Sequence, residues 1–426
     1  MRDTKVTESS NELSERVKWY TLAILTIVYA FNFIDRQILV ILLPLIKAEL
    51  NLSDTYLGLL SGIAFALFYT ILGIPIARLA DRSNRRNIIA IALTAWSAMT
   101  VVSGMAQNFI QLLFARMGVG IGEAGGSPPA HSMISDMFKA KQRATALAIY
   151  SAGLYLGVVI GFSAGGFLGE TFGWRNTFFI VGVPGVLLAL ILWLTVPEPP
   201  RPKTVVGETG PTFFETLSHV LALKSFPFIA IGCSLSAFIS YGTSNFMPSY
   251  MVRFHDFPLT EIGLWLGITG GGGGIIGTFL GGYLTDKIGK KDPSWYLWLP
   301  GATAVAGIPF AVYAFNTDNT PMMLTSYFIT AILGTLYLAP SIAVLHRLVH
   351  PQMRAMTSAL LFFVLNLIGL GAGPVVIGML SDGFGNLRIA LTIGAGVALV
   401  KGYLFWAGGR KLPADIEATE NLSSEG

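Results

Sequence analysis

The sequence predicts an all-α, multi-pass membrane protein with twelve transmembrane helices in two pseudo-symmetric six-helix bundles. Hydrophobic residues make up 53% of the 426 residues and charged residues only 12%, whereas a soluble domain carries about 25% charged residues. The mean hydropathy of +0.63 agrees with this. Apolar stretches long enough for a span of about 20 residues lie at 18–46, 55–80, 87–106, 109–137, 143–169, 176–196, 226–250, 260–285, 295–315, 321–347, 355–380 and 387–407.

One long polar connection divides these stretches six and six. It contains several prolines and covers residues 197–225, whereas the other connections are short. We therefore expect an N-terminal bundle at 1–196, a cytoplasmic linker at 197–225 and a C-terminal bundle at 226–426.

Basic residues are concentrated on one side of the predicted membrane. With the N-terminus inside, twenty lysines and arginines fall in inside segments, and four fall outside: Lys47, Arg175, Arg253 and Arg388. Cytoplasmic segments carry the excess of positive charge. We expect a location in the inner (plasma) membrane, with both termini cytoplasmic.

The two halves repeat one charge pattern at matching helix ends, ARLADRSNRR in the first and GGYLTDKIGKK in the second. Each has an acidic residue followed by basic ones. This indicates a duplicated unit, and such repeats build a substrate site between them. The residues concerned are Asp81, Arg85, Arg86, Asp286 and Lys290.

Four charged residues lie deep in the predicted spans: Asp35, Arg36, Arg116 and Glu123. A charge at the bilayer centre costs about 2.5–3.5 kcal/mol on the mildest scale, so such residues face the bundle interior and have partners. They form either a structural ion-pair group or, as we favour, a site for substrate and protons. Lys401, near the end of the last span, can extend to the interface.

Helix geometry predicts which of these charges meet. Asp35 and Arg36 are adjacent, so their side chains diverge by about 100° and do not pair. Counted at about 1.5 Å per residue from the outer surface, Arg116 lies about 10 Å deep, Asp35 about 16 Å and Glu123 about 21 Å. We expect Asp35 to attract Arg116, and Arg36 to reach Glu123 or the edge of a cavity.

Asp35 and Glu123 are the candidates for proton coupling. A dry surrounding favours the protonated form of a carboxylate and a nearby arginine favours the charged form, so such a site can switch. The arginines suit an anionic group such as phosphate or carboxylate. In YGTSNFMPSY of the seventh span, Tyr241, Asn245 and Phe246 either line the cavity or only pack a proline-kinked helix.

Apparent enzyme and cofactor motifs lack their structural context. GFSAG at 161–165 lies within a predicted helix, whereas a nucleophile elbow follows a strand. GGGGGIIG at 270–277 also follows no strand. With one cysteine and scattered histidines we expect no metal, cofactor or enzymatic activity. His131, after the SPP break, is a possible cavity residue.

Glycines recur at every fourth position of the fifth span. Small residues at this spacing let two membrane helices approach closely. The contact is either static packing or a sliding contact between the halves. The residues are Gly153, Gly157, Gly161 and Gly165.

The repeated charge pattern resembles the loop motif G-x-L-A-D-R-x-G-R-R of the major facilitator superfamily. Ala77 and Asn84 replace its two glycines, whereas the second-half copy keeps both. Arg116 followed by Gly120 resembles the arginine motif of helix 4 in that superfamily. The resemblance implies two bundles that rock in alternating access, with the repeated charges as contacts of a cytoplasmic gate.

Three further stretches, NFIDRQ, GIGEAGGSPPAHSMISDMF and FGWR, resemble the Spinster family of that superfamily. Its animal members are associated with export of sphingosine 1-phosphate or lysophospholipids. We expect a proton-coupled transporter of an amphipathic anion such as a lysolipid or sphingolipid-like molecule, acting as a monomer among membrane lipids and binding no nucleic acid. The alternatives are a proton-coupled transporter of a small organic anion or drug-like molecule, a uniporter, or a receptor with structural charges. A membrane enzyme acting on lipids is disfavoured, because no nucleophile has a base at matching depth.

Overall fold

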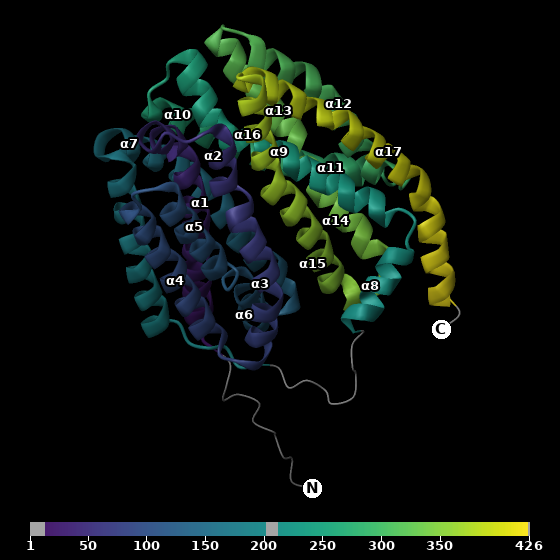
Figure 1. Cartoon of the computed structure of the whole chain (residues 1–426). Helices are drawn as coiled ribbons and strands as arrows, with labels where there is room; N and C mark the ends of the chain where they lie inside the picture. The colour runs from purple at the N-terminus through teal and green to yellow at the C-terminus, as the bar shows by residue number, and fades with distance from the viewer. Residues whose placement is uncertain (1–12, 202–211, 425–426) are drawn as a thin grey trace.

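The computed structural model describes residues 13–201 and 212–424, and these form helices joined by short connections (Figure 1). No strand occurs in the described residues, which confirms the all-α prediction. In the same residues, ten helices are long and apolar enough to cross a membrane.

The first half contains seven helices, drawn in purple to teal-blue in Figure 1. They are α1 (Glu15–Leu50), α2 (Asp54–Ser61), α3 (Ile63–Arg82), α4 (Arg85–Met105), α5 (Phe109–Glu123), α6 (Ser127–Met137) and α7 (Ala140–Thr195). Helices α2 and α3 together form one predicted span, as do α5 and α6.

The second half is drawn in teal to yellow (Figure 1). Its elements are α8 (Phe213–Ala222), α9 (Phe226–His255), α10 (Leu259–Leu266), η1 (Gly267–Gly272), α11 (Gly273–Ile288), α12 (Trp295–Asn316), α13 (Thr320–Thr335), α14 (Leu338–Arg347), η2 (Pro351–Met353), α15 (Arg354–Leu365), η3 (Asn366–Ala372), α16 (Gly373–Phe384) and α17 (Leu387–Ser424).

Two details account for the difference between ten long helices and the twelve expected spans. The 55-residue stretch Lys141–Thr195 is continuous by length, but its chain turns at Gly173, where φ is 75° and ψ is 165°. Side chains with a Cβ rarely adopt this φ, so glycine permits the turn. The fourth span is divided into α5, of 15 residues, and α6, of 11 residues. With these two differences, the expected spans are all present.

Side-chain caps set several helix ends. Ser14, Ser53, Asn84 and Asn108 accept hydrogen bonds from backbone N–H groups in the first turns of α1, α2, α4 and α5. Helix α1 ends at Asn51 in the left-handed conformation, with φ of 51°, which asparagine tolerates better than most residues.

The fifth-span glycines pack against α1 within the first half. A Cβ on Gly153 would lie 2.6 Å from the backbone oxygen of Thr26, and one on Gly161 would lie 3.0 Å from the Cα of Ile34. Gly157 and Gly165 face α1 in the same way. The sliding-contact alternative is therefore wrong for these four residues, because one face of α7 carries them all and that face meets α1.

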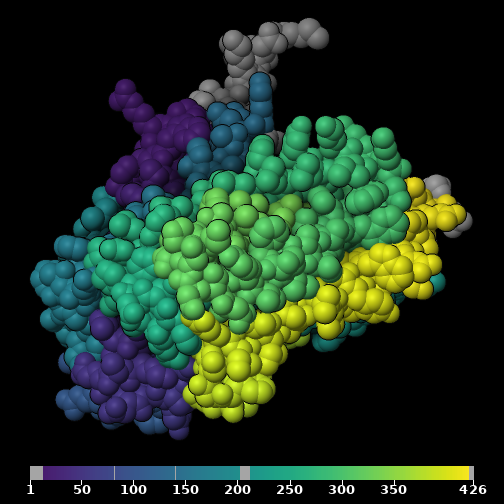
Figure 2. Space-filling model, turned by 90° about the horizontal axis from the view of Figure 1, so that it is seen from above, coloured from purple at the N-terminus to yellow at the C-terminus, as the bar shows by residue number. Residues whose placement is uncertain are grey.

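Other glycines bring the two halves together. A Cβ on Gly58 of α2 would lie 2.8 Å from the Cα of Val375 of α16. A Cβ on Gly166 of α7 would lie 3.2 Å from the Cα of Gly263 of α10. The view in Figure 2 shows the teal-green segment α10–α11 directly against α7. Close backbone approach at α2–α16 and α7–α10 thus forms the interface between the halves.

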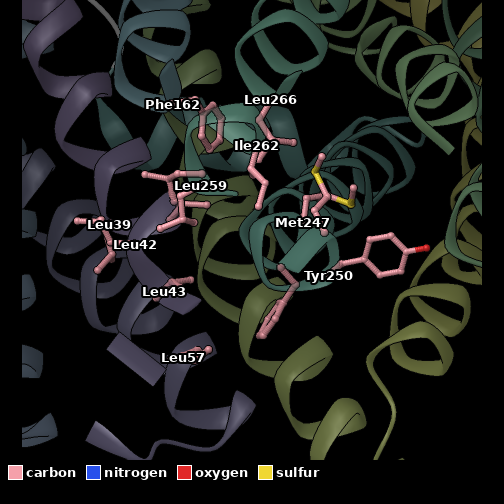
Figure 3. Close-up of a cluster of buried hydrophobic side chains, with 14 of the residues drawn as sticks. Leu39, Leu42, Leu43, Leu57, Phe162, Met247, Tyr250, Leu259, Ile262 and Leu266 are labelled. Atoms are coloured by element: carbon pink, nitrogen blue, oxygen red, sulfur yellow. The ribbon is translucent and has the colours of Figure 1, made fainter. Parts of the chain in front are cut away.

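Both halves contribute to one hydrophobic cluster beside this interface. Leu42 of α1, Leu57 of α2, Met247 of α9 and Ile262 of α10 are fully buried in it, and Figure 3 shows them converging from four helices. The cluster lies near the end of α1 and the start of α2. We call this the sealed end, and the opposite end, at which α1 begins and α17 finishes, the terminal end.

The expected linker contains a short helix, α8. Its capping box joins Thr212 and Glu215 through two hydrogen bonds, and the bond from the Thr212 backbone lowers the pKa of Glu215. Helix α7 ends at Thr195 and α9 begins at Phe226, on either side of this linker. Residues 202–211 lie outside the described residues.

Helix α17 continues well beyond the expected span end at residue 407, to Ser424. Its extension packs at the terminal end, where Asp415 accepts hydrogen bonds from the backbone N–H groups of Lys224 and Ser225, at 3.1 and 2.7 Å. A carboxylate at these orphan donors stabilises the start of α9. The extension therefore positions the first helix of the second bundle.

Candidate functional site

Asp35 and Arg36 face different partners from one turn of α1. Asp35 accepts a hydrogen bond from Nη1 of Arg116 on α5 at 3.4 Å and another from Oγ1 of Thr100 on α4 at 2.6 Å. Asp35 and Arg116 are 3% and 1% exposed. The expected Asp35–Arg116 attraction is thus a buried ion pair. Thr100 was not expected, because a lone hydroxyl in an apolar span carries no signal.

Arg36 contacts Glu123, as one of the two sequence alternatives proposed. Its Nε donates to Oε2 of Glu123 at 2.7 Å. Its guanidinium also lies 5.1, 4.5 and 4.8 Å from the ring centroids of Phe33, Phe65 and Tyr69. Such cation–π contacts add about 0.5–2 kcal/mol each. The sequence analysis missed this aromatic cage, although FALFYT of the second span is an aromatic cluster at similar depth.

Two atoms of this group have no hydrogen-bond partner in the structure. They are Oε1 of Glu123 and Nε of Arg116, and both are buried. Both carboxylate oxygens of Asp35, in contrast, accept a hydrogen bond. A carboxylate oxygen without a donor is the place where a bound proton is least opposed. Asp35 is therefore hydrogen-bonded at both carboxylate oxygens, and Glu123 at only one.

The two ion pairs differ in access. The Arg36 side chain is 14% exposed and Glu123 is 0% exposed, whereas the side chains of Arg116 and Asp35 are 1% and 4% exposed. Arg36 therefore has the most exposed side chain of the four. The Asp35–Arg116 pair lies behind it.

The residues expected to line a cavity in the seventh span do not share one role. Tyr241 is partly buried and borders two hydrophobic clusters. Asn245 is 4% exposed and donates to the Ser61 backbone oxygen at 3.3 Å, across the two halves. Phe246 is fully buried in the sealed-end cluster. The lining prediction is wrong for Phe246, because helix packing points that side chain into the core.

His131 lies beside a stack of tyrosines in the first half. It is exposed, and its ring meets Tyr150 edge-on at 5.0 Å. Tyr150 in turn stacks on Tyr29 at 4.5 Å. The role of His131 as a cavity residue stays a prediction.

The predicted gate arginines bind within their own half. Arg85 is 1% exposed and pairs with Asp136 and with Glu198, the latter at 2.7 Å. Arg86 donates to the backbone oxygens of Trp193 and Val196 at the end of α7. These contacts bind the linker entrance to the loop between α3 and α4. They make no contact with the second half in the described residues.

The second-half copy of the gate pattern is exposed at the terminal end. Asp286 accepts a hydrogen bond from the Tyr296 hydroxyl at 3.1 Å, and Lys290 is exposed. The side chain of Asp81 lies outside the described residues. Among the described side chains, the two copies of the charge pattern do not contact each other.

The sealed end carries a charged network across the halves that the sequence analysis missed. Asp54 on α2 accepts hydrogen bonds from both terminal nitrogens of Arg253 on α9, at 2.7 and 2.6 Å. It also accepts from Lys47 at 2.5 Å and from Ser381 of α16 at 2.6 Å. Bidentate arginine–carboxylate pairs are among the strongest polar contacts. A comparison of depths could have paired Asp54 with Arg253, since both lie at the same membrane surface.

Asp382 on α16 caps the start of α2. It accepts hydrogen bonds from the backbone N–H groups of Asp54 and Thr55 at 2.9 and 2.8 Å, and from the Thr55 hydroxyl at 2.6 Å. Glu170 of α7 similarly accepts from the Thr260 N–H of α10 at 2.8 Å. Each half therefore caps a helix of the other at the sealed end.

The sequence suggested that Lys401 extends to the membrane interface, but in the structure it does not. It is 3% exposed, and its Nζ lies 5.2 Å from the ring centroid of Tyr337. The prediction is wrong because this face of α17 packs on α9 and α12. In the described residues, no group of three or more histidine, cysteine or acidic side chains that could hold a metal occurs.

A model of the Major Facilitator Superfamily matches residues 25–360 of the chain. The chain belongs to the major facilitator superfamily. Members of this superfamily are transporters, so this is a multi-pass membrane transporter rather than an enzyme.

The chain is similar in sequence to transporters of different kinds, of which two are described here. It is 32% identical to an MFS-type efflux pump of Mycolicibacterium smegmatis (strain ATCC 700084 / mc(2)155) over 420 residues, which cover 96% of this chain and 97% of the pump. It is 26% identical to a probable galactarate/D-glucarate transporter of Bacillus subtilis (strain 168) over 427 residues, 92% of each chain.

The fold is similar to a crystal structure of a bacterial homolog to the human lysosomal transporter Spinster. In the inward-facing and unoccupied conformation of that homolog, the TM-score is 0.89 at 34% identity, covering 95% of this chain and 99% of the homolog. In its inward-facing and occupied conformation, the TM-score is 0.79, covering 97% and 98%. This similarity confirms the Spinster-like resemblance.

Proposed function

We propose that this transporter couples proton movement to the transport of an amphipathic anion by alternating access. Glu123 binds the proton, Arg36 binds the anionic group, and the Asp35–Arg116 pair holds the site in place. The observation that carries the proposal is the buried Glu123 carboxylate, which pairs with Arg36 through Oε2 and has no partner at Oε1.

The pairing itself supports a link between proton and anion. While Glu123 is ionised, it neutralises Arg36 and the site has no spare positive charge. A proton on Oε1 removes the negative charge, and the Arg36 guanidinium then becomes free to bind an anion. Proton and anion binding therefore favour each other through one ion pair, which is the requirement for their coupled transport.

The surroundings of Arg36 support an amphipathic substrate. Its guanidinium lies between Phe33, Phe65 and Tyr69, so an anionic group bound there is bordered by aromatic surface. A phosphate or carboxylate attached to an apolar chain matches this combination. The Spinster-like fold favours a lysolipid or sphingolipid-like molecule as such a substrate.

The proposal also includes the orientation of the chain in the membrane. In the sequence, twenty lysines and arginines fall in the predicted inside segments and four in the predicted outside segments, which favours a plasma-membrane protein with cytoplasmic termini. The sealed end then faces outward and the terminal end faces the cytoplasm. The protein would act as a monomer with lipids, protons and the substrate as its partners.

A small organic anion is the second candidate substrate. The similarity to a probable galactarate/D-glucarate transporter favours it, because a sugar diacid needs cationic groups but no aromatic surroundings. In a uniporter, the third possibility, the same ion pairs would only stabilise the fold.

Proteoliposomes with and without a pH gradient test the proposal. We expect gradient-driven transport of lysophosphatidate in the wild type, and loss of the gradient dependence in Glu123→Gln. Asp35→Asn should impair transport by loosening Arg116, with some gradient dependence retained. Glu215→Gln, at an exposed residue of α8, is the matched control for loss of a carboxylate.

The outcomes separate the candidates. Gradient-driven transport that survives in Glu123→Gln contradicts proton coupling at Glu123. Transport of glucarate without transport of lysophosphatidate contradicts the lipid substrate but keeps the coupling. Downhill transport that ignores the gradient in the wild type indicates a uniporter.

A further inference from the structure

The second membrane span is broken at a single residue, Gly62. Helix α2 ends at Ser61 and α3 begins at Ile63, and Gly62 between them has φ of −113° and ψ of −101°, which is not helical. In a continuous helix, the Phe65 N–H would donate to the Ser61 oxygen, four residues earlier. Here it donates to the Gly62 oxygen at 3.2 Å. The break therefore removes the helical donor of the Ser61 carbonyl.

Asn245 of the second half supplies the missing donor. Its Nδ2 donates to the Ser61 oxygen at 3.3 Å, and its Oδ1 accepts from the Ser244 hydroxyl at 3.5 Å. Asn245 and Ser61 are both buried, at 4% and 7% exposed, and a buried carbonyl without a donor is costly. A contact between the halves thus stabilises a break within the first half.

The π-helical segment η3 of the second half packs directly on the same break. A Cβ on Gly62 would lie 2.7 Å from the Gly371 oxygen and 3.3 Å from the Leu370 oxygen. A Cβ on Gly371 would in turn lie 3.5 Å from the Cβ of Ala66, one turn into α3. Single π-helical turns are frequent at functional sites and at helix bends. Asn245 and η3 therefore both contact the first half where its second span is bent.

Phe65 connects the break to Arg36. Its N–H is the group that the break redirects, and the centroid of its ring lies 4.5 Å from the Arg36 guanidinium carbon. Tyr69, one turn further along α3, stacks on Phe65 with ring centroids 5.3 Å apart and lies 4.8 Å from the same guanidinium. The direction of the first two turns of α3 therefore sets the aromatic cage around Arg36.

We propose that the break at Gly62 is a two-state switch, that Asn245 is its positioning residue, and that it links the sealed end to Arg36. While Asn245 holds the Ser61 carbonyl, the span is bent. When the halves separate at the sealed end, Ser61 loses Asn245 and accepts from the Phe65 N–H, as in a continuous helix. The span then straightens, and the cage moves away from Arg36.

The switch rests on the proposed function and names the regulation of its anion-binding residue. In the bent state, Phe65 and Tyr69 cover the guanidinium of Arg36, whose side chain is 14% exposed. In the straight state the guanidinium loses these contacts, and an anion can replace them. An anion on Arg36 and an open sealed end then favour each other, because each favours the straight span. Rigid-body rocking alone gives no such link, since the cage and Arg36 belong to one half.

A distance across the break tests the switch without any substrate. Spin labels at Tyr56 of α2 and Leu79 of α3, both exposed, are placed in the full-length Cys233→Ser transporter, and straightening lengthens their separation. Asn245→Leu removes the donor and keeps a side chain of similar size. It should raise the ratio of long to short distances about 5-fold or more. An unchanged ratio overturns the inference.

A control and a second variant separate the switch from general loosening. Ser236→Ala removes another buried hydrogen-bonding group of α9, whose bond lies within the helix, and should leave the ratio unchanged. Gly62→Ala keeps Asn245 but places a Cβ against the Gly371 oxygen, so it should also lengthen the distance. Gly73→Ala of α3, where a Cβ meets no atom within 4 Å, should not. Short distances in Gly62→Ala, or long distances in both control variants, contradict the switch.

Opening of the sealed end should move the break in the wild-type switch. Asp54→Asn removes the carboxylate that binds Arg253, and labels at Gln107 and Phe384 report the separation of the halves. The long Tyr56–Leu79 distance should increase in population together with this separation. Separation of the halves with an unchanged Tyr56–Leu79 distance shows rigid-body rocking and overturns the inference.

The switch and the proposed function fail in different ways. Addition of lysophosphatidate or D-glucarate should increase the population of the straight span in the wild type. A response to glucarate alone overturns the lipid substrate and supports the switch. Transport that ignores the pH gradient, together with a Tyr56–Leu79 distance that follows opening of the sealed end, overturns proton coupling and supports the switch. Gradient-driven transport with a fixed Tyr56–Leu79 distance supports the coupling and overturns the switch.

Discussion

The two ends of this transporter use similar charged residues in opposite ways. At the sealed end, Asp54 of the first half binds Arg253 and Ser381 of the second. At the terminal end, Arg85 binds Asp136 and Glu198 of its own half. Ion pairs therefore hold the halves together at one end and stabilise each half separately at the other. The fold is similar to that of a bacterial Spinster homolog in an inward-facing conformation.

The ion pairs between the halves and the ion pairs within one half should therefore affect different properties. In the proposed alternating access, contacts across the halves break on the way to the opposite conformation, so their strength sets the balance between conformations. Contacts within one half persist through a rigid-body motion and set its stability. Mutations at the two ends should therefore change different measured quantities.

The largest expected effect is on stability, from Arg85→Met at the terminal end. It leaves Asp136 and Glu198 without their buried partner, and removal of one member of a buried pair costs about 3–5 kcal/mol. Thermal unfolding in detergent should show a clear drop in the melting temperature. Arg82→Met, at an exposed arginine of the same loop, is the control. An unchanged melting temperature would mean that the Arg85 contacts contribute little.

The next effect is conformational, from Asp54→Asn at the sealed end. Lys47 and Arg253 would then face each other without the carboxylate, and truncation of such a pair costs about 2–5 kcal/mol. Spin labels at Gln107 and Phe384, in a Cys233→Ser background, should report a larger population of long distances across the sealed end.

Asp318→Asn is the matched control for Asp54→Asn. Asp318 also pairs with an arginine near the sealed end, Arg388 at 2.6 Å, but its side chain is 84% exposed and both residues belong to the second half. Equal distance changes in the two variants would contradict the special role of the contact between halves.

Gly378→Val should have an intermediate effect at the sealed end. A Cβ on Gly378 would lie 2.9 Å from the Cα of Thr55, so α16 and α2 must separate, at about 1–3 kcal/mol. The same spin-label pair should show partial opening. Gly383→Ala, where a Cβ meets no atom within 4 Å, should leave the distances unchanged. Opening in both variants would indicate general loosening of α16.

The smallest effect is expected from Asp286→Asn at the terminal end. Asp286 is exposed and accepts from Tyr296, so the change should alter stability by less than about 0.5 kcal/mol and leave the sealed-end distances unchanged. A large conformational shift would instead show that Asp286 contacts the first half in this state.

Much of the candidate site follows from local geometry. Adjacent residues on a helix diverge, and depth increases by a constant rise per residue, so the separation of Asp35 from Arg36 and the meeting of Asp35 with Arg116 could be predicted. The Arg36–Glu123 pair was one of two alternatives, because its formation depends on how a long side chain packs. Thr100 and the aromatic cage depend on helix rotation, which composition does not specify.

The sequence by itself determined the class of protein, the twelve spans and the burial of Asp35, Arg36, Arg116 and Glu123, because hydropathy and helical rise act along the chain. Only the tertiary structure decided which helix faces meet. It placed the fifth-span glycines against α1, turned Lys401 inward beside Tyr337, and joined Asp54 to Arg253 across the halves. The physical reason is that contacts between distant segments depend on the packing of whole helix surfaces, and no single stretch carries that information.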